Sequence, residues 1–310
     1  MKALVTGADG FVGRYLADAL QRGGAEAVLA GGPAARGPFL PLDINDGDSV
    51  RAAFEAAKPD VVFHLAAQTF VPDSIASPKE TYRTNVLGTA AILHAVRGQR
   101  DAGGASARVM LVSSAEVYGK QEQSAYPLKE SVAPNPGNPY AASKAAAEAL
   151  VLGESSTYGL DVVITRAFNH IGPGQSDRFV VATFASQLAA IAKGAAPQLW
   201  VGNLEAKRDF LDVRDVVEAY VALASGGESG QIYNVASGSA VSIREILGEL
   251  VRIARVPVEI REDPERTRPS DTPLSCGNSE KLRGRTGWAP NLTLRRSLQD
   301  VYAAALSSAP

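Results

Sequence analysis

The sequence is poor in the residues that build disulfides and metal sites. Its 310 residues include one cysteine, Cys276, and three histidines, His64, His94 and His170. One cysteine cannot form a disulfide within the chain, which favours a reducing, cytoplasmic location. The histidines lie far apart in the sequence and lack the spacing of metal ligands, so we expect no structural metal site.

Strong charge and long apolar runs are also missing. The formal net charge is −2 and no basic run occurs, which argues against a nucleic-acid partner. The apolar stretch after Lys2 ends at Gly7, which is too short for a secretion signal. No later segment approaches the roughly 20 apolar residues of a membrane span, so we expect no membrane partner.

The first half of the chain alternates apolar strands with amphipathic helices. Strands are predicted at 2–6, 27–30, 39–43, 60–66, 108–113 and 161–166, and helices at 11–22, 48–57, 78–96 and 140–158. This order predicts an α/β fold with a doubly wound parallel sheet of the Rossmann type. The rhythm then stops, and helices at 179–193 and 243–254 stand between loops.

We therefore predict two domains. A dinucleotide-binding domain covers 1–166, and a smaller, mixed α/β substrate lobe covers 167–310. The segment at about 212–236 is expected to return to the first domain.

Three glycines, Gly7, Gly10 and Gly13, separate the first strand from the first helix. In dinucleotide-binding loops such glycines allow a tight turn, close approach to a pyrophosphate, and helix–strand packing. The following helix N-terminus offers N–H groups and a positive dipole end to the phosphates. This segment predicts a nicotinamide dinucleotide cofactor.

The second strand ends at Gly31-Gly32, where NAD sites usually carry an acid. Its absence, with Arg36 nearby to pair with a 2′-phosphate, favours NADP and leaves NAD possible. Arg36 could equally be a solvated loop residue. Asp43 could accept a hydrogen bond from the adenine amino group, or it could cap the next helix.

Tyr140 and Lys144 are four residues apart on a predicted helix and so share one face. A nearby ammonium should stabilise the phenolate and lower the pKa of the phenol from its usual value of about 10. Ser114 follows the fifth strand, where it could bind a substrate oxygen beside Tyr140. Asn85 could bridge to Lys144 through water, or it could be a buried, hydrogen-bonded amide.

Several motifs together resemble those of the extended short-chain dehydrogenase/reductases that act on nucleotide sugars: TGADGFVG, FHLAAQ, TNVLGT, SSAEVYG and YAASK. The segments at 166–175 and 201–215 resemble those of GDP-4-keto-6-deoxy-D-mannose reductases, and 268–271 resembles their C-terminal substrate loop. The segment GNLEAKRD also resembles GDP-mannose 4,6-dehydratases, which suggests a shared GDP-sugar pocket.

The resemblance implies roles for particular residues. The catalytic residues would be Ser114, Tyr140, Lys144 and Glu116. The cofactor would contact Gly7, Gly10, Phe11, Val12, Gly13, Arg36, Asp43, Ile44, Leu65, Ala66, Ala67, Asn85, Tyr140, Lys144 and Phe168. The GDP-sugar would contact Gln68, Ser114, Asn169, Val180, Lys193, Val201, Arg208, Arg268 and Asp271. Without the resemblance, Arg208 and Arg268 would be surface charges paired with Asp209 and Asp271.

The sequence favours a reductase over a 4,6-dehydratase or a 4-epimerase of the same family. Ala115 follows Ser114 at a position where 4,6-dehydratases usually carry a polar residue, and alanine cannot exchange a proton. We therefore expect NAD(P)H-dependent reduction of the C4 ketone of GDP-4-keto-6-deoxy-D-mannose to GDP-D-rhamnose. A dehydratase, a 4-epimerase and a non-catalytic dinucleotide sensor remain alternatives. The resemblance also implies a homodimer through the long helices around Tyr140.

Overall fold

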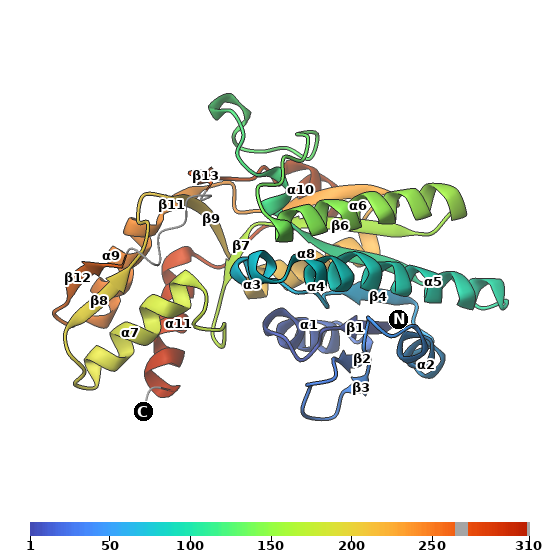
Figure 1. Cartoon of the computed structure of the whole chain (residues 1–310), viewed down its shortest axis with the longest axis horizontal. Helices are drawn as coiled ribbons and strands as arrows, with labels where there is room; N and C mark the ends of the chain where they lie inside the picture. The colour runs from blue at the N-terminus through green and yellow to red at the C-terminus, as the bar shows by residue number, and fades with distance from the viewer. Residues whose placement is uncertain (264–271, 309–310) are drawn as a thin grey trace.

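The computed structural model of the chain describes residues 1–263 and 272–308. Its main element is a parallel, seven-stranded sheet in the order β10-β6-β5-β4-β1-β2-β3 (Figure 1). The strands are β1 (Lys2–Thr6), β2 (Glu26–Gly31), β3 (Leu40–Pro41), β4 (Val61–His64), β5 (Arg108–Ser114), β6 (Val162–Ala167) and β10 (Gln231–Val235). The doubly wound parallel fold expected from the sequence is confirmed.

Two apolar layers cover this sheet. On one face, α1 (Phe11–Arg22) and α8 (Val213–Gly226) pack on the sheet in one continuous core. On the other face, α2 (Gly47–Ala57), α5 (Gly88–Asp101) and α6 (Pro139–Tyr158) form a second core. The central strands β4 and β6 are buried along their whole length, because helices cover both faces of the sheet.

The helix expected over 78–96 is present and contains one π-helical turn. The structure has α3 (Val71–Ala76) and α4 (Pro78–Tyr82), then a single π-helical turn, η1, over Arg83–Leu87, before α5 begins. The π turn buries Asn85, which is 2% exposed. Such wide turns interrupt α-helices at functional sites more often than elsewhere.

A second, smaller unit lies beside the carboxyl ends of the central strands (Figure 1). Its core is formed by α7 (Val180–Ala192), α9 (Ile243–Ala254) and α11 (Leu294–Ser308) against short strands. The strand β9 (Lys207–Asp212) pairs with β7 (Asn169–Ile171), β11 (Ala240–Ser242) and β13 (Leu274–Ser275). A separate pair joins β8 (Gln198–Val201) to β12 (Glu259–Glu262).

The chain passes between the two units repeatedly. After β9, α8 packs on α1, and β10 pairs with β6 at the edge of the large sheet. The helix α10 (Glu280–Thr286) then packs on α8 and β10 before α11 returns to the small unit. Where two domains should be divided stays a prediction. Among the described residues, no helix combines the length and apolarity needed to span a bilayer.

Candidate active site

A cleft of about 1090 Å³ separates the carboxyl ends of the central strands from the small unit. The large sheet contributes the glycine loop, the segments after β4 and β5, and the start of α6. The small unit contributes β7, residues 175–184 and residues 200–210. Pockets for a single small ligand are usually about 300–1,000 Å³, so this cleft lies just above that range, and its lining runs from the glycine loop to the small unit.

The glycine loop fits a dinucleotide. Gly7 has a φ of +68°, and a Cβ on it would lie 2.9 Å from the Ala66 Cα. A Cβ on Gly13 would lie 2.5 Å from the Ala8 Cα, so α1 can pack closely on β1 only with glycine here. Gly10, the N-cap of α1, has no side chain to cap the helix, and the first-turn amides are left for a phosphate.

Most expected cofactor residues line this cleft: Gly7, Gly10, Phe11, Val12, Gly13, Asp43, Ile44, Leu65, Ala66, Ala67, Tyr140, Lys144 and Phe168. Arg36 is exposed and lies outside the lining. Asp43 accepts a hydrogen bond from the Asn45 N–H at 2.9 Å. The alternative that Asp43 caps the next helix is wrong, because Asp46 is the N-cap of α2.

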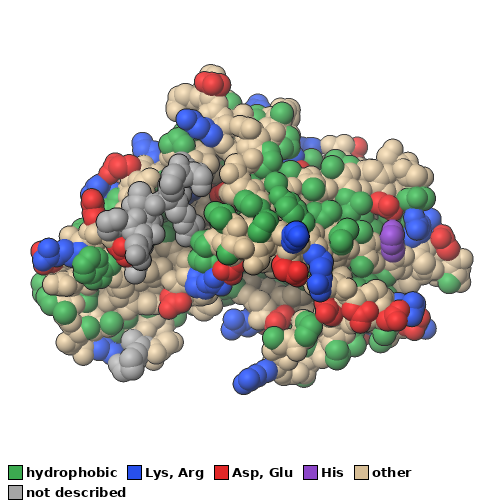
Figure 2. Space-filling view, viewed as in Figure 1, with side chains coloured by type: hydrophobic (Ala, Val, Ile, Leu, Met, Phe, Trp, Pro, Cys, Tyr) green, Lys and Arg blue, Asp and Glu red, His purple; other side chains and the backbone are tan. Residues whose placement is uncertain are grey.

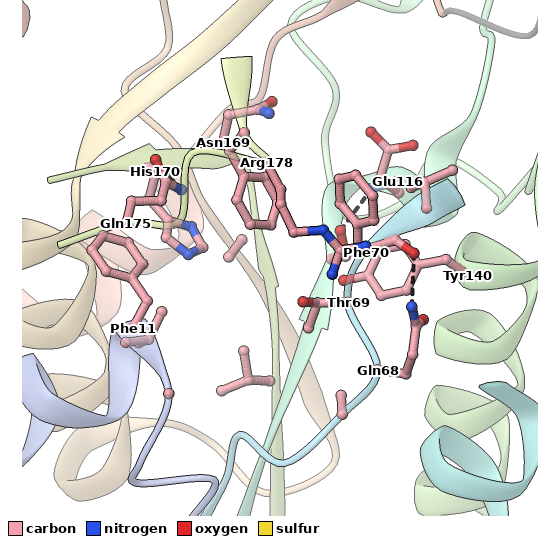
Figure 3. A pocket seen from close by; sticks show the side chains of 18 of the residues that line it. Phe11, Gln68, Thr69, Phe70, Glu116, Tyr140, Asn169, His170, Gln175 and Arg178 are labelled. Atoms are coloured by element: carbon pink, nitrogen blue, oxygen red, sulfur yellow. Dashed lines mark hydrogen bonds between the residues drawn. The ribbon is translucent and has the colours of Figure 1, made fainter. Parts of the chain in front are cut away.

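Tyr140 and Lys144 reach the cleft because α6 begins just before them. The Asn138 side chain caps α6 by accepting a hydrogen bond from the Ala141 N–H at 2.8 Å. The Lys144 Nζ donates to the Val112 carbonyl at 2.8 Å, which ties it to the end of β5. The Ser114 Oγ accepts from the Glu116 N–H at 3.2 Å. Figure 3 shows Tyr140 and Glu116 at the same end of the cleft.

Burial controls the two titrating groups. It raises the pKa of Tyr140 to about 12, aided by the Glu116 carboxylate and opposed by a hydrogen bond from Ser114. Burial also lowers the pKa of Lys144 to about 8, opposed by the Glu148 carboxylate. The expected lowering of the Tyr140 pKa by Lys144 is wrong for this structure, because burial of the phenol raises the pKa and Lys144 is not among the groups that act on it.

Asn85 holds a neighbouring loop rather than reaching Lys144 directly. Its Oδ1 accepts from the Gln68 N–H at 2.8 Å, and its Nδ2 donates to the Gln68 carbonyl and the Ser143 Oγ, both at 2.9 Å. These contacts agree with the buried-amide alternative. The Gln68 Nε2 donates to the Phe70 carbonyl at 2.7 Å.

The Gln68 side chain therefore has one unused acceptor. Its Oε1 is buried and has no hydrogen-bond partner among the described residues, and Gln68 lines the cleft. Buried acceptors are nearly always satisfied in native proteins. This oxygen is thus placed to accept a hydrogen bond from a bound ligand.

Two aromatic contacts and an ion pair join the walls of the cleft near its mouth. The Arg178 guanidinium lies 3.8 Å from the centre of the Phe70 ring, and its Nη2 donates to the Asp73 Oδ1 at 2.7 Å. Phe179 meets Phe70 edge to face, with ring centres 5.9 Å apart. Sequence reasoning missed Arg178, and no local pattern marks it.

Phe11 and His170 form a second contact across the cleft (Figure 3). Their rings are parallel, with centres 6.2 Å apart. Burial lowers the pKa of His170, so its imidazole is neutral at physiological pH. The neighbouring Tyr15 hydroxyl donates to the Pro173 carbonyl at 2.7 Å, which joins α1 to the segment after β7.

Three of the expected substrate residues on the small unit, Asn169, Val180 and Arg208, line the cleft. Arg208 donates to the Lys207 carbonyl at 2.9 Å. It does not pair with Asp209 as the surface-charge alternative had it. Asp209 is buried and accepts from Ser237 and from the N–H groups of 238 and 277.

The remaining expected substrate residues are less well placed. Lys193 lies at the C-terminal end of α7, whose 13 residues put it roughly 20 Å from Val180 and away from the cleft. Val201 is fully buried in the core of the small unit. Arg268 and Asp271 lie outside the described residues.

The chain resembles known proteins in sequence over nearly its whole length. Residues 32–301 match a family described as GDP-mannose 4,6 dehydratase. The chain is 41% identical to the GDP-6-deoxy-D-mannose reductase of Pseudomonas aeruginosa, over 97% of this chain and 96% of the relative.

Two solved structures resemble the fold closely. The structure of RMD from Pseudomonas aeruginosa complexed with NADPH has a TM-score of 0.87 and 38% identity, with 99% of both chains covered. The UDP-glucose 4-epimerase of Thermus thermophilus in complex with NAD has a TM-score of 0.88 and 30% identity, with 99% of this chain and 100% of the other covered.

Proposed function

Because the chain belongs to the GDP-mannose 4,6 dehydratase family of extended short-chain dehydrogenase/reductases, we propose that it reduces a GDP-sugar ketone. The substrate is GDP-4-keto-6-deoxy-D-mannose, and the product is GDP-D-rhamnose. NADPH is the cofactor, and NADH is possible. The observation that carries the proposal is that Ser114, Tyr140 and Lys144 meet in the cleft that begins at the glycine loop.

Bound NADPH would supply the hydride that is added to C4. Tyr140, whose phenol stays protonated at neutral pH because its pKa is about 12, donates a proton to the developing alkoxide. Ser114 donates a hydrogen bond to the ketone oxygen and so places it beside Tyr140. Lys144, held near the end of β5, contributes positive charge and binds the nicotinamide ribose.

The cleft also offers groups for the rest of the substrate. Gln68 presents its unused Oε1 to a sugar hydroxyl. A diphosphate requires positive charge, and the basic side chains among the described lining residues, apart from neutral His170, are Lys144, Arg178 and Arg208. Lys144 lies with Ser114 and Tyr140 at the catalytic end of the cleft. Arg178 and Arg208 are therefore the groups that bind the diphosphate. The resemblance adds Asn169, Val180, Arg268 and Asp271 to this part of the proposal.

Turnover of NADPH with GDP-4-keto-6-deoxy-D-mannose tests the function. We expect a decay of NADPH absorbance that depends on the keto-sugar, and a product whose C4 configuration is that of GDP-D-rhamnose by NMR. The configuration of GDP-6-deoxy-D-talose would correct the product but not the reaction. A sugar interconversion without net NADPH consumption would instead identify an epimerase.

The family description makes a dehydratase the alternative to exclude. Glu116 lines the cleft and could exchange a proton, but the neighbouring Ala115 is buried and has no group that could do so. Dehydration at C5 and C6 needs two such groups. Conversion of GDP-mannose to the 4-keto-6-deoxy sugar, with no NADPH consumption, would identify a dehydratase.

A cytoplasmic homodimer completes the proposal. Large hydrophobic side chains are exposed on α3, α4 and η1, where Ile75 is 55%, Tyr82 40% and Leu87 65% exposed. Figure 2 shows hydrophobic side chains gathered over this part of the molecule, and α6 beside it exposes the small residues Ala146, Ala149 and Gly153. A Leu87→Glu variant should be monomeric by light scattering.

A further inference from the structure

A buried ion pair lies directly behind the catalytic helix face. Tyr140, Lys144 and Glu148 follow one another at four-residue steps along α6, and all three are buried. The Glu148 carboxylate accepts from the Arg166 Nη2 at 2.7 Å and from its Nε at 3.1 and 3.2 Å. The side chain of Arg166 is 3% exposed and that of Glu148 4%. Truncating either partner of such a pair leaves an uncompensated buried charge.

Glu148 joins three elements that carry site residues. Besides Arg166 of β6, it accepts a hydrogen bond from the Ser113 Oγ of β5 at 2.6 Å. Ser113 directly precedes Ser114, and Arg166 is two residues before Phe168. The carboxylate thus fixes the end of β5 and the end of β6 to the helix that holds Tyr140 and Lys144.

The side of Arg166 that faces away from Glu148 is also covered by other residues. The Arg166 guanidinium lies 4.7 Å from the centre of the Tyr118 ring, and the Tyr118 hydroxyl donates to the Asn234 Oδ1 at 2.8 Å. The Asn234 N–H donates to the Glu130 Oε1 at 2.8 Å. These contacts hold Arg166 in place on the side that faces away from Glu148.

Glu148 is also the anion that acts on Lys144. Burial drives Lys144 toward its neutral form, and the Glu148 charge opposes this. Of the other titratable groups nearby, Tyr140 is protonated, and His64 of β4 is neutral because burial lowers its pKa to about 3. Glu116, in the turn after β5, acts on Tyr140.

The remaining charges on elements packed against α6 are paired elsewhere or exposed. The pairs are Arg83 with Glu80, Arg97 with Glu154, Arg100 with Asp101, Arg108 with Asp161 and Asp73 with Arg178, and Lys79 and His94 are exposed. Glu148 is therefore the described carboxylate that opposes the loss of the Lys144 charge on burial.

We propose that Glu148 is a positioning residue that keeps Lys144 charged. It also fixes the end of β5, which carries Ser114, and the end of β6, which Phe168 follows. This inference rests on the proposed role of Lys144. The carboxylate touches neither substrate nor cofactor, and it acts through Lys144, Ser113 and Arg166.

The charge of Lys144 can be measured without cofactor or substrate. Lysine is labelled with ¹³C at Cε, the Lys144 signal is assigned by its loss in Lys144→Met, and the protein is titrated by NMR. In the unsubstituted protein we expect a midpoint of about 8. Glu148→Gln should lower the midpoint by about one pH unit, because the Glu148 charge opposes the effect of burial, and a nearby opposite charge typically shifts a pKa by roughly 1–3 units.

Asp161→Asn is the matched control. Asp161 pairs with the Arg108 Nε at 2.8 Å and so also joins β5 to the chain entering β6, but at the amino ends of these strands. It should lower thermal stability and leave the Lys144 midpoint unchanged. Glu148→Asp keeps the negative charge, so its Lys144 titration midpoint should lie close to that of the unsubstituted protein.

Two results would overturn the proposal: an unchanged midpoint in folded Glu148→Gln, or an equal shift in Asp161→Asn. If Glu148→Gln does not fold, the charge-balanced variant Glu148→Gln/Arg166→Gln replaces it. Its expected lowering is smaller, because the positive charge of Arg166 is removed as well, and an unchanged midpoint is again the contrary outcome. Failure of the proposed reductase activity would appear as missing turnover in the unsubstituted protein, and the titration is independent of it.

Discussion

The buried part of the cleft around Tyr140, the catalytic end, and the half-exposed part around Arg178, the mouth, are built differently. At the catalytic end, Tyr140, Lys144 and Glu148 are buried on one helix and held by hydrogen bonds to β5 and β6. At the mouth, Arg178 and Asp73 form a single ion pair whose side chains are 49% and 50% exposed. A half-exposed pair contributes about 0–1 kcal/mol and exchanges partners easily, whereas a buried pair is costly to break. The catalytic end is therefore preorganised, and the mouth can rearrange to admit a substrate.

The largest effect is expected at the catalytic end. Tyr140→Phe removes the general acid and should lower kcat by roughly 10²–10⁴-fold while leaving the dissociation constant for GDP-sugar unchanged. Steady-state NADPH consumption and calorimetric GDP-sugar binding measure the two quantities. Tyr158→Phe, at the exposed end of the same helix, is the control and should keep full activity. Near-normal turnover of Tyr140→Phe would disprove the assignment.

A substitution at the mouth should affect binding instead. Arg178→Ala should raise KM for the GDP-sugar roughly 10- to 150-fold with kcat nearly unchanged, because a charge-assisted hydrogen bond contributes about 1.5–3 kcal/mol. Arg244→Ala is the control, since Arg244 forms an ion pair with Glu205 in the same unit and lies outside the cleft lining. A loss of kcat without a change in KM would instead show that Arg178 acts in the chemical step and not in substrate binding.

The pH dependence of kcat tests the charge of Lys144 at the catalytic end. Since the pKa of Lys144 is lowered to about 8, its charged form dominates below that pH and is lost above it. We expect kcat to fall as pH rises through about 8, by up to roughly tenfold per unit, as the ammonium disappears. Tyr140, with a pKa of about 12, adds no decline in this range. A kcat that stays level from about pH 7 to about pH 10 would contradict the role of Lys144.

The smallest effect is expected at Arg36, beyond the adenosine end of the cleft. If the arginine pairs with the 2′-phosphate, Arg36→Ala should raise KM for NADPH about threefold and leave KM for NADH unchanged, because an exposed pair is weak. Arg51→Ala, which breaks an exposed pair with Asp48 in the same unit, serves as control. Equal changes for both cofactors would remove Arg36 from the cofactor site.

Local sequence patterns predicted six of the seven strands of the large sheet, all but β10, and the helix that places Tyr140 and Lys144 in the cleft. Apolar strands followed by glycines or by helix caps need only neighbouring residues to be recognised, and Tyr140 with Lys144 needs only helical periodicity. The helix α8 was missed although its signal was present. Asp212 caps it by accepting from the Arg214 N–H, and apolar residues follow at 213, 216, 217 and 220.

Other features depend on contacts between distant residues. The partners Arg178 and Asp73 are 105 residues apart, and β9 gathers its neighbouring strands from three separate parts of the chain. The direction of the Tyr140 pKa shift followed from burial, which a four-residue spacing does not reveal. The sequence therefore indicated which polar groups line the cleft but not the burial that controls their pKa values.

The position of β10 has a consequence for synthesis of the protein. The strand β6 is buried along its whole length, and its outer edge is covered only when residues 231–235 pair with residues 163–167. A ribosome makes β7, α7, β8, β9 and α8 between these two strands. For all that time the edge of β6 has backbone groups without a partner strand, and such edges promote aggregation. A nascent chain that pauses before residue 231 should consequently depend on chaperones more than one that pauses after residue 235.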